Sequence, residues 1–265
     1  MINYIITERQ QNLLKELYVA QGKFDIKPVI YFYRHLLKDI LDKKRKKVLE
    51  ITRLFFRNEL GVSTKKWNDD QLESYLLDIK DNESSGTGWN IIRTYPKVFR
   101  KPSTIVSLSY FLMKNLFKVY EFEGLEYVKQ VEFPFNRFFF FDPEIQEFVG
   151  YLETKKSLSL PGKSMQVVMS AVEREYVGRG YGSRMYLCIL NQVDYLMSDD
   201  TLYPDSLNIW VNYLPNKVNV WAKLYEEDSN TGSQIVQLTS QKFINPDKID
   251  KFIASSSKTN PPNIK

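Results

Sequence analysis

The segment from Ser164 to Ser183 limits the possible folds of this chain more than any other part of the sequence. It begins with a run of apolar and β-branched residues, continues through a short charged stretch, and contains three glycines in five residues, from Gly178 to Gly182. From Met185 to Met197, apolar residues recur at every fourth position, which is the spacing of one helix face. The segment therefore predicts a strand, a glycine turn and a helix, in that order.

A glycine turn between a strand and a helix can bind an anion. Glycine has no Cβ, so its backbone adopts positive φ angles and lets a ligand approach closely. The free N–H groups of the first helical turn and the positive end of the helix dipole face the same space. Such a turn suits a phosphate or pyrophosphate, although the same spacing also occurs in tight turns that bind nothing. No lysine follows these glycines as in a P-loop, and the third glycine of GxGxxG is absent.

The turn resembles motif A of the GNAT superfamily of acyl-CoA N-acyltransferases, [QR]xxGx[GA], through Arg179-Gly180-Tyr181-Gly182. The resemblance implies an α+β fold, GNAT-like, with a central mixed, mainly antiparallel sheet, and acetyl-CoA as co-substrate with an amine as acceptor. It also implies that the Val172 amide polarises the thioester carbonyl. The pyrophosphate would then be held by the turn and the helix start, at Gly178, Arg179, Gly180, Gly182 and Ser183.

Three positions depart from the family pattern. Val177 replaces the Gln or Arg that opens the motif, and Gln166 stands where histone acetyltransferases carry the strand glutamate that acts as general base. An amide accepts no proton at neutral pH. Trp210 matches the tyrosine that protonates the leaving thiolate in many GNAT enzymes, and it cannot do so. The sequence therefore predicts the fold and leaves catalysis open.

Other residues are candidates for these proton transfers. Glu173 and Glu175 follow the predicted strand and would relay a proton through water if they face the cleft. Tyr213 lies about one helical turn after Trp210 and is a candidate acid. Each of these residues also fits a solvated link or a core position.

Composition narrows the functional class. The chain has 265 residues, of which 43% are hydrophobic and 26% charged, which is ordinary for a globular protein. A single cysteine, Cys188, excludes an internal disulfide and a multi-cysteine zinc site, and a single histidine, His35, argues against a Ser-His-Asp triad. We expect no metal. No apolar stretch has the length of a membrane span and no signal peptide is visible, so we expect a cytoplasmic protein without a membrane partner.

A net charge of +5 and a pI near 9.0 suit an anionic partner or ligand. The densest basic run is Lys43 to Lys47, inside a helical pattern. Such a run is usually a solvated helix face, and the alternative is contact with nucleic acid.

The sequence also predicts how the chain is divided. Residues 1–85 read as a helical N-terminal extension with a helix over Pro28–Leu60 and another capped by Asn68-Asp69-Asp70, and the polar segment Asp81–Gly88 reads as a linker. A GNAT-like domain then covers residues 86–253, and residues 254–265 read as a flexible tail. Within the domain we expect helices from Ser103 to about Tyr120 and from Pro204 to Leu214, and strands at 89–93, 127–133, 137–141, 147–154, 165–172, around 195–199, 218–225 and 235–238.

Three functional classes follow. The first is an N-acyltransferase that moves an acetyl group from acetyl-CoA to an amine of a protein or small molecule. The second is a GNAT-like structural or interaction protein without catalysis. It is suggested by Ser198-Asp199-Asp200, Ser206 and Trp210, which resemble short GNAT-like proteins of bacteriophages and imply a phage particle or the host cytoplasm. The third is a nucleic-acid-binding protein that uses the basic run.

Overall fold

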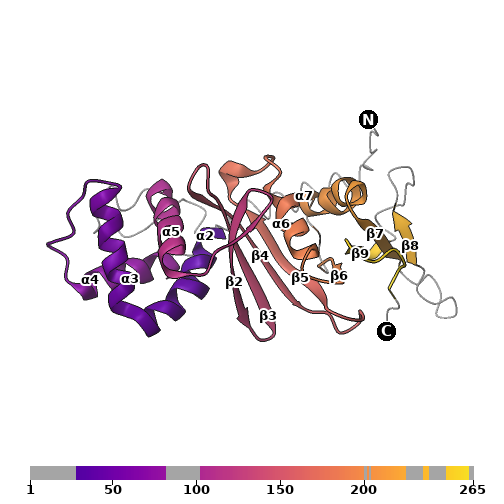
Figure 1. Ribbon diagram of the computed structural model, residues 1–265, viewed down its shortest axis with the longest axis horizontal. Helices are drawn as coiled ribbons and strands as arrows, with labels where there is room; N and C mark the ends of the chain where they lie inside the picture. Colours follow the sequence, from indigo (N-terminus) through magenta and orange to yellow (C-terminus); the bar gives the residue numbers. More distant parts are fainter. Residues whose placement is uncertain are drawn as a thin grey trace. The chain divides into compact units, whose positions relative to one another are not determined.

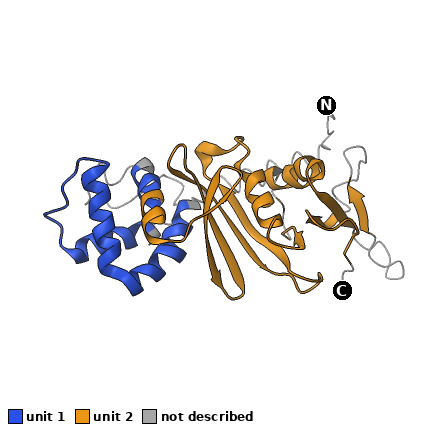
Figure 2. Cartoon of the chain, in the orientation of Figure 1, with its two compact units in different colours: residues 1–109 blue, residues 110–265 orange. Residues whose placement is uncertain are grey.

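The computed structural model describes residues 28–81, 102–199, 202, 204–224, 235–238 and 249–262. The chain divides into two compact units, residues 1–109 and 110–265 (Figure 2). The predicted strand at 89–93 and nearly all of the predicted linker lie outside the described residues.

The described secondary structure of the first unit is helical. The predicted long helix at Pro28–Leu60 is present as three successive segments: α2 (Pro28–Tyr31), the π-helix η1 (Phe32–Leu37) and α3 (Lys38–Asn58). The helix α4 (Asp69–Asp81) begins after a capping box in which Asn68 and Gln71 bond each other's backbone N–H groups, as the Asn68 signal predicted.

A kink interrupts α3 inside the basic run, where Lys44 has φ −141° and ψ 39°. The helix ends before Gly61, whose φ of 62° is the left-handed conformation that glycine adopts readily. Apolar side chains of α3 and α4, such as Val48, Phe56 and Leu72, are fully buried, so this unit has a core of its own.

The second unit is built on a mixed sheet of nine strands in the order β1-β2-β3-β4-β5-β6-β9-β7-β8 (Figure 1). Among the strands that the structure describes, only β5 and β6 pair in parallel, and every other neighbouring pair is antiparallel. The predicted mixed, mainly antiparallel sheet is therefore confirmed. The strands are β1 (Tyr120–Phe122), β2 (Leu125–Glu132), β3 (Phe135–Asp142), β4 (Glu147–Lys156), β5 (Ser164–Val172), β6 (Tyr195–Met197), β7 (Asn219–Leu224), β8 (Ile235–Leu238) and β9 (Ile249–Ser255).

Helices connect or precede these strands. They are α5 (Pro102–Leu116), the 3₁₀ turn η3 (Arg174–Tyr176), α6 (Tyr181–Leu190), α7 (Pro204–Asn208), the π-helix η4 (Ile209–Tyr213) and the 3₁₀ turn η5 (Leu214–Asn216). The predicted helix from Ser103 ends four residues earlier than expected, at Leu116, because β1 begins at Tyr120.

The helical period that we read through Met197 was wrong beyond Leu190, where α6 ends. Val193 lies in the connection after α6 and Met197 lies in β6, and both side chains are buried. The apolar residues at helical spacing therefore belong to a helix, a connection and a strand. Strand β9 was not predicted. It reaches Ser255, two residues into the segment that we assigned to the tail, and Tyr195 donates a hydrogen bond to the carbonyl of Asn260 further along that segment (3.4 Å).

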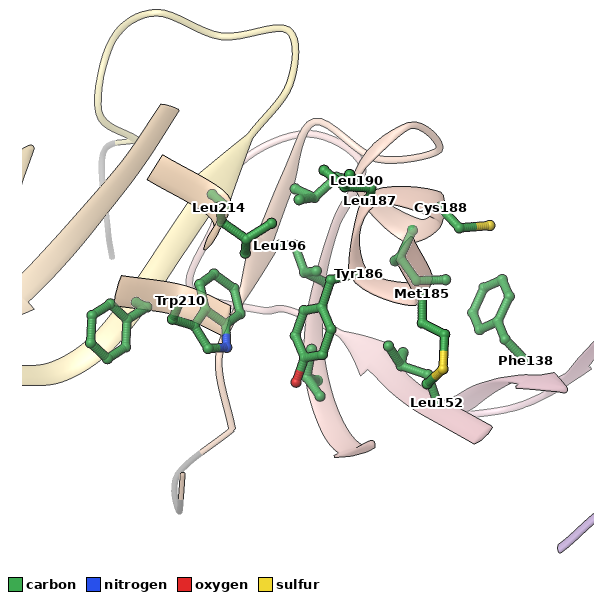
Figure 3. Packing of buried hydrophobic residues seen from close by; sticks show 14 of the residues in the cluster. Phe138, Leu152, Met185, Tyr186, Leu187, Cys188, Leu190, Leu196, Trp210 and Leu214 are labelled. Carbon is green, nitrogen blue, oxygen red and sulfur yellow. The ribbon is translucent and has the colours of Figure 1, made fainter. Parts of the chain in front are cut away.

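The main core of the second unit lies between α6 and one face of the sheet. Side chains alternate between faces along a strand, so Phe138 and Phe140 of β3 face α6 while Phe139 and Phe141 are buried on the other side. Figure 3 shows part of this core, where Met185 and Tyr186 of α6 pack with Leu152 of β4. Since α6 follows the glycine turn directly, this packing fixes where the turn lies at the end of β5.

Candidate functional site

Strands β5 and β6 separate partway along β5. Their parallel pairing covers only Ser164 to Gln166, whereas β5 continues to Val172. On the other side, β5 pairs with β4 up to Val172. Among the described residues, no strand pairs with the later half of β5 on the β6 side, so this half presents an open backbone edge.

The direction of the backbone groups along this edge follows from the pairing with β4. The N–H of Glu173 donates to the carbonyl of Val149 at 2.9 Å, and a Cβ built on Gly150 would lie 3.0 Å from the carbonyl oxygen of Ala171. Successive backbone groups alternate sides along a strand. The N–H groups of Val172 and Ser170 therefore point away from β4, towards the open edge.

The glycine turn begins where this edge ends. Gly178 and Gly180 have φ angles of 83° and 80°, which favour glycine, and a Cβ at either position would meet open space. Gly180 is the N-cap of α6, and the first intrahelical bond runs from the N–H of Arg184 to its carbonyl (3.2 Å). The N–H groups of residues 181 to 183 precede that bond and form the helix N-terminus.

Two of the predicted binding residues have additional roles in this turn. The Arg179 N–H donates to the carbonyl of Tyr176 at 3.3 Å, so it closes the turn. A Cβ on Gly182 would lie 3.2 Å from Ile209 Cδ1 and 3.7 Å from Val172 Cγ2. The start of α6 therefore lies close to the end of β5 and the start of η4, and the small size of Gly182 allows this approach.

Two tyrosines anchor the turn to the β3–β4 hairpin. Tyr176 donates to the Glu147 carboxylate, and Tyr181 donates to Asp142 Oδ2 at 2.6 Å. The two rings pack edge to face, with centroids 5.8 Å apart. Burial and then the hydrogen bond to Asp142 raise the pKa of Tyr181 to about 12, so its hydroxyl remains a donor at neutral pH.

An arginine side chain lies over each of these two rings. The Arg179 guanidinium lies 5.3 Å from the ring centre of Tyr176, and that of Arg184 lies 4.6 Å from the ring centre of Tyr181. Arg184 also donates to the carbonyl of Glu123 (3.3 Å). Two arginine side chains thus lie at the glycine turn and at the first turn of α6.

The predicted catalytic residues belong to two different elements, with Glu173 and Glu175 at η3 and Tyr213 in η4. Glu173 is the N-cap of η3, and Glu175 is exposed. Burial first, and then the charge of Glu175, raise the pKa of Glu147, so Glu175 lies near the start of β4. Tyr213 is half-buried and packs against the apolar core at the end of η4.

Gln166 occupies a structural position. Its side chain is 8% exposed, and its amide donates to the carbonyl of Ser198 at 3.4 Å. The bond joins β5 to the residue that follows β6, at the point where the two strands separate. A carboxylate could not donate this bond.

Sequence reasoning missed a pair of hydroxyls at the separation of β5 and β6. Tyr186 is buried, and its hydroxyl lies 2.9 Å from Ser170 Oγ. A tyrosine on the apolar face of a helix reads as a core residue, and only the fold brings Ser170 to its hydroxyl.

Cys188 and His35 lie in surroundings that suit packing and not catalysis. Cys188 is buried, and burial raises its pKa to about 12, so its thiol is neutral and unsuited to nucleophilic attack. The ring of His35 stacks on Tyr31 at 5.7 Å. The described parts of the chain contain no group of three or more potential metal ligands, and they contain no helix long and apolar enough to span a bilayer.

The basic run belongs to the first unit. Arg45, at its centre, forms ion pairs with Asp70 (2.6 Å) and Glu73 (2.5 Å) of α4. The four lysines of the run are exposed. The central arginine is therefore engaged within the unit, and the lysines are the part of the run that faces solvent.

No protein-family model and no curated protein sequence matches this chain. Solved structures with local similarity include nourseothricin acetyltransferase (12% identity over 52% of this chain and 71% of that chain, TM-score 0.29). They also include the ribosomal-protein-S5-alanine acetyltransferase of Vibrio fischeri (10%, 54% and 100%, 0.30) and Tetrahymena GCN5 (12%, 79% and 87%, 0.25).

These TM-scores are low, so the fold is argued from the chain's own topology. An antiparallel series of strands leads to β5, and β5 leads through the glycine turn and α6 to its parallel neighbour β6. A helix and further antiparallel strands follow. This α+β order agrees with the GNAT-like fold that the sequence predicted.

Proposed function

We propose that the protein is an N-acyltransferase that transfers an acetyl group from acetyl-CoA to an amine of a protein or a small molecule. The observation that carries this proposal is the direct continuation of the open β5 edge into the glycine turn and the N-terminus of α6. The edge supplies backbone hydrogen-bonding groups, and the turn supplies an anion site. Acetyl-CoA has a group for each of them: an arm with amides and a thioester for the open edge, and a pyrophosphate for the turn.

The anion site would hold the pyrophosphate. The amides at the start of α6, including those of Gly182 and Ser183, would donate to it, and the open space at Gly178 and Gly180 would allow close approach. The arginines Arg179 and Arg184 would offset its charge.

The open edge would hold the arm and the thioester. The N–H of Val172 points to this edge and would polarise a carbonyl oxygen placed there. The amine then attacks the carbonyl carbon, the C–N bond forms, and the C–S bond breaks with its electron pair on sulfur. Glu173 remains a candidate for the proton that nitrogen loses, because it follows the edge directly.

Calorimetric titration with acetyl-CoA and with CoA tests the proposal. Arg179→Glu places a negative charge beside the pyrophosphate and should weaken binding at least tenfold. Arg174→Glu is the matched control, because it makes the same charge change at an exposed position of η3 without changing the turn. Binding that is equal in both variants, or absent from the parent protein, would contradict the proposal.

A second candidate is a GNAT-like protein that serves in contact or structure and not in catalysis. It is favoured by Gln166, which stands at the position of the family base and is used to join β5 to the chain after β6. The test is release of free thiol from acetyl-CoA in the presence of a lysine peptide, a peptide with a free N-terminus, or spermidine. Thiol release with any of these amines would exclude this candidate.

A further inference from the structure

The sheet of the second unit exposes apolar side chains at one of its ends. Among the described residues, the most exposed large apolar side chains are Val131 (71%), Phe133 (94%) and Leu158 (88%). Val131 and Phe133 lie at the end of the β2–β3 hairpin, and Leu158 lies in the connection between β4 and β5. Strands β2 and β4 both pair antiparallel with β3, so the two connections lie at the same end of the sheet, the lower end in Figure 1.

The backbone of the β2–β3 hairpin holds Phe133 away from the protein. The last pair of this ladder is Glu132 with Phe135. The turn between the strands therefore contains only Phe133 and Pro134. A two-residue turn between paired strands has no slack with which to fold its side chains back on to the sheet. Phe133 thus projects from a turn whose position the paired strands fix.

The connection between β4 and β5 is ordered as well. The N–H of Ser157 donates to the carbonyl of Ser164 at 3.0 Å, which closes the connection at its base. The hydroxyl of Ser164 donates to the carbonyl of Pro161. Leu160 is buried in a small apolar cluster with side chains of β6, β7 and β9, whereas Leu158 is left in solvent. One leucine anchors the connection, and the other stands at its tip.

The same end of the sheet is mainly basic. Strands β5, β6 and β7 begin at this end and β9 finishes there. Glu132 and Asp194 are acids at this end, and each of them is paired. Glu132 forms an ion pair with Arg137, and Asp194 forms one with Lys258 at 3.5 Å. Exposed or half-buried lysines lie in or next to the described connections at this end, namely Lys155, Lys156, Lys163, Lys217 and Lys258.

We propose that this end of the second unit binds the surface of an anionic lipid bilayer. Phe133 and Leu158 enter the boundary between headgroups and acyl chains, and the lysines contact the anionic headgroups. A bilayer surface matches this arrangement, because its interior accepts aromatic and leucine side chains while its negative surface potential attracts lysines. The inference goes beyond the proposed function.

The form of the apolar surface favours a bilayer over a protein partner. A protein interface buries a contiguous patch with a closely packed apolar core. Here nearly bare side chains stand on two separate tips, each of which suits insertion. Binding from outside the bilayer needs no spanning helix. The proposal therefore departs from the expectation of a protein without a membrane partner, which rested on the lack of a spanning segment and a signal peptide.

Binding at this end leaves the candidate acetyl-CoA site accessible. Strand β5 begins at the basic end with Ser164 and finishes at Val172, and the glycine turn follows. The turn therefore lies at the opposite end of β5 from the two tips. Acetyl-CoA would reach it from solvent while the tips are in the bilayer, so the two binding events should be independent.

Flotation with lipid vesicles tests the proposal. The parent protein should bind vesicles of equal parts phosphatidylcholine and phosphatidylglycerol about tenfold or more tightly than vesicles of phosphatidylcholine alone. Phe133→Ala and Leu158→Ala each remove an inserted side chain and should weaken binding to the anionic vesicles about tenfold. Lys156→Glu should weaken this binding about fivefold or more, and added salt should weaken it too.

Two variants at the other end of the sheet are matched controls. Ile145→Ala removes an exposed apolar side chain from the turn between β3 and β4. Arg174→Glu makes an equal charge change at an exposed position of η3. Both should bind the anionic vesicles as the parent does. The Phe133 and Leu158 variants should keep the parent's calorimetric affinity for acetyl-CoA, so failure of this proposal and failure of the proposed function are distinguishable.

Phe133→Trp separates insertion from adsorption. Brominated acyl chains quench an indole that enters the bilayer, so the fluorescence of this variant should fall more than that of the parent. Equal quenching, no binding to the anionic vesicles, or parental binding by both Phe133→Ala and Leu158→Ala would overturn the proposal. A photoreactive side chain at position 133 that captures protein and not lipid in cells would assign the tips to a protein partner and overturn it as well.

Discussion

The Tyr181 hydroxyl donates a hydrogen bond of 2.6 Å to Asp142 Oδ2, and this bond joins the first residue of α6 to the turn between β3 and β4. The other oxygen of Asp142 accepts from the N–H groups of Glu144 (2.8 Å) and Ile145 (3.4 Å), which shapes that turn. One carboxylate therefore orders the hairpin turn and positions the start of the helix. The two segments are 39 residues apart in sequence.

Replacement of Asp142 should loosen both segments. Asp142→Ala leaves the buried Tyr181 hydroxyl and two turn N–H groups without their acceptor, so the free energy of unfolding should fall by about 1–3 kcal/mol. Urea denaturation measures this change, and calorimetry should show weaker acetyl-CoA binding. Asp205→Ala, an exposed change on α7, is the control. An Asp142→Ala variant as stable as that control would show that the bond contributes nothing.

Glycine at position 180 should matter more than glycine at position 182. Gly180 has a φ of 80°, so Gly180→Ala forces a left-handed conformation on alanine and should cost about 1–2 kcal/mol. Gly182→Ala has an ordinary φ and must displace only the end of the Ile209 side chain, 3.2 Å away. Thermal denaturation of both variants measures the difference. The prediction fails if Gly182→Ala is the less stable of the two.

A carboxylate at position 166 should destabilise the fold. Gln166→Glu places an acceptor against the carbonyl of Ser198 in a site that is 8% exposed, so the bond is lost and a buried charge is added. The free energy of unfolding should fall by about 1–3 kcal/mol at pH 8 and recover partly at pH 5, where the carboxyl is protonated. Denaturation at the two pH values checks this. Equal losses at both pH values would argue against burial of the charge.

Stability should decrease in alkaline solution. The pKa values of Cys188 and Tyr181 are raised to about 12 in the folded protein, from 9.0 and 10.0, because burial disfavours their charged forms. A raised pKa gives stability that is complete below the unfolded value and is lost as pH rises towards the folded value. The free energy of unfolding should therefore fall from about pH 9 towards pH 12, and less steeply in Cys188→Ala. A parallel decline in parent and variant would contradict the assignment to this thiol.

The same burial should protect Cys188 from thiol reagents. The side chain is 1% exposed and its thiol is neutral, so reaction with an aromatic disulfide reagent should be slow in the native protein and fast in urea. The Cys188→Ala variant should show no absorbance change with the reagent, which identifies Cys188 as the reacting group. Rapid modification of the native protein would show that α6 opens readily.

Much of the fold could be predicted because its signals are local. The strand, glycine turn and helix around Gly180 depend on residues adjacent in sequence, and so do the Asn68 cap and the turn at Asp142. Spacing alone could not separate a helix from the turn and strand that follow Leu190, because all three bury apolar residues. The boundary between α6 and β6 was therefore predicted in the wrong place.

Local residue patterns predicted most of the described strands and helices and the place of the glycine turn among them, but they did not predict β9 or the end of α6. The tertiary structure was needed to show that β9 lies between β6 and β7, that β5 continues beyond its pairing with β6, and that the hydroxyls of Ser170 and Tyr186 lie within hydrogen-bonding distance. These relationships join residues far apart in the chain. They depend on strand order and on the packing of α6 against the sheet, which no local pattern of residues specifies.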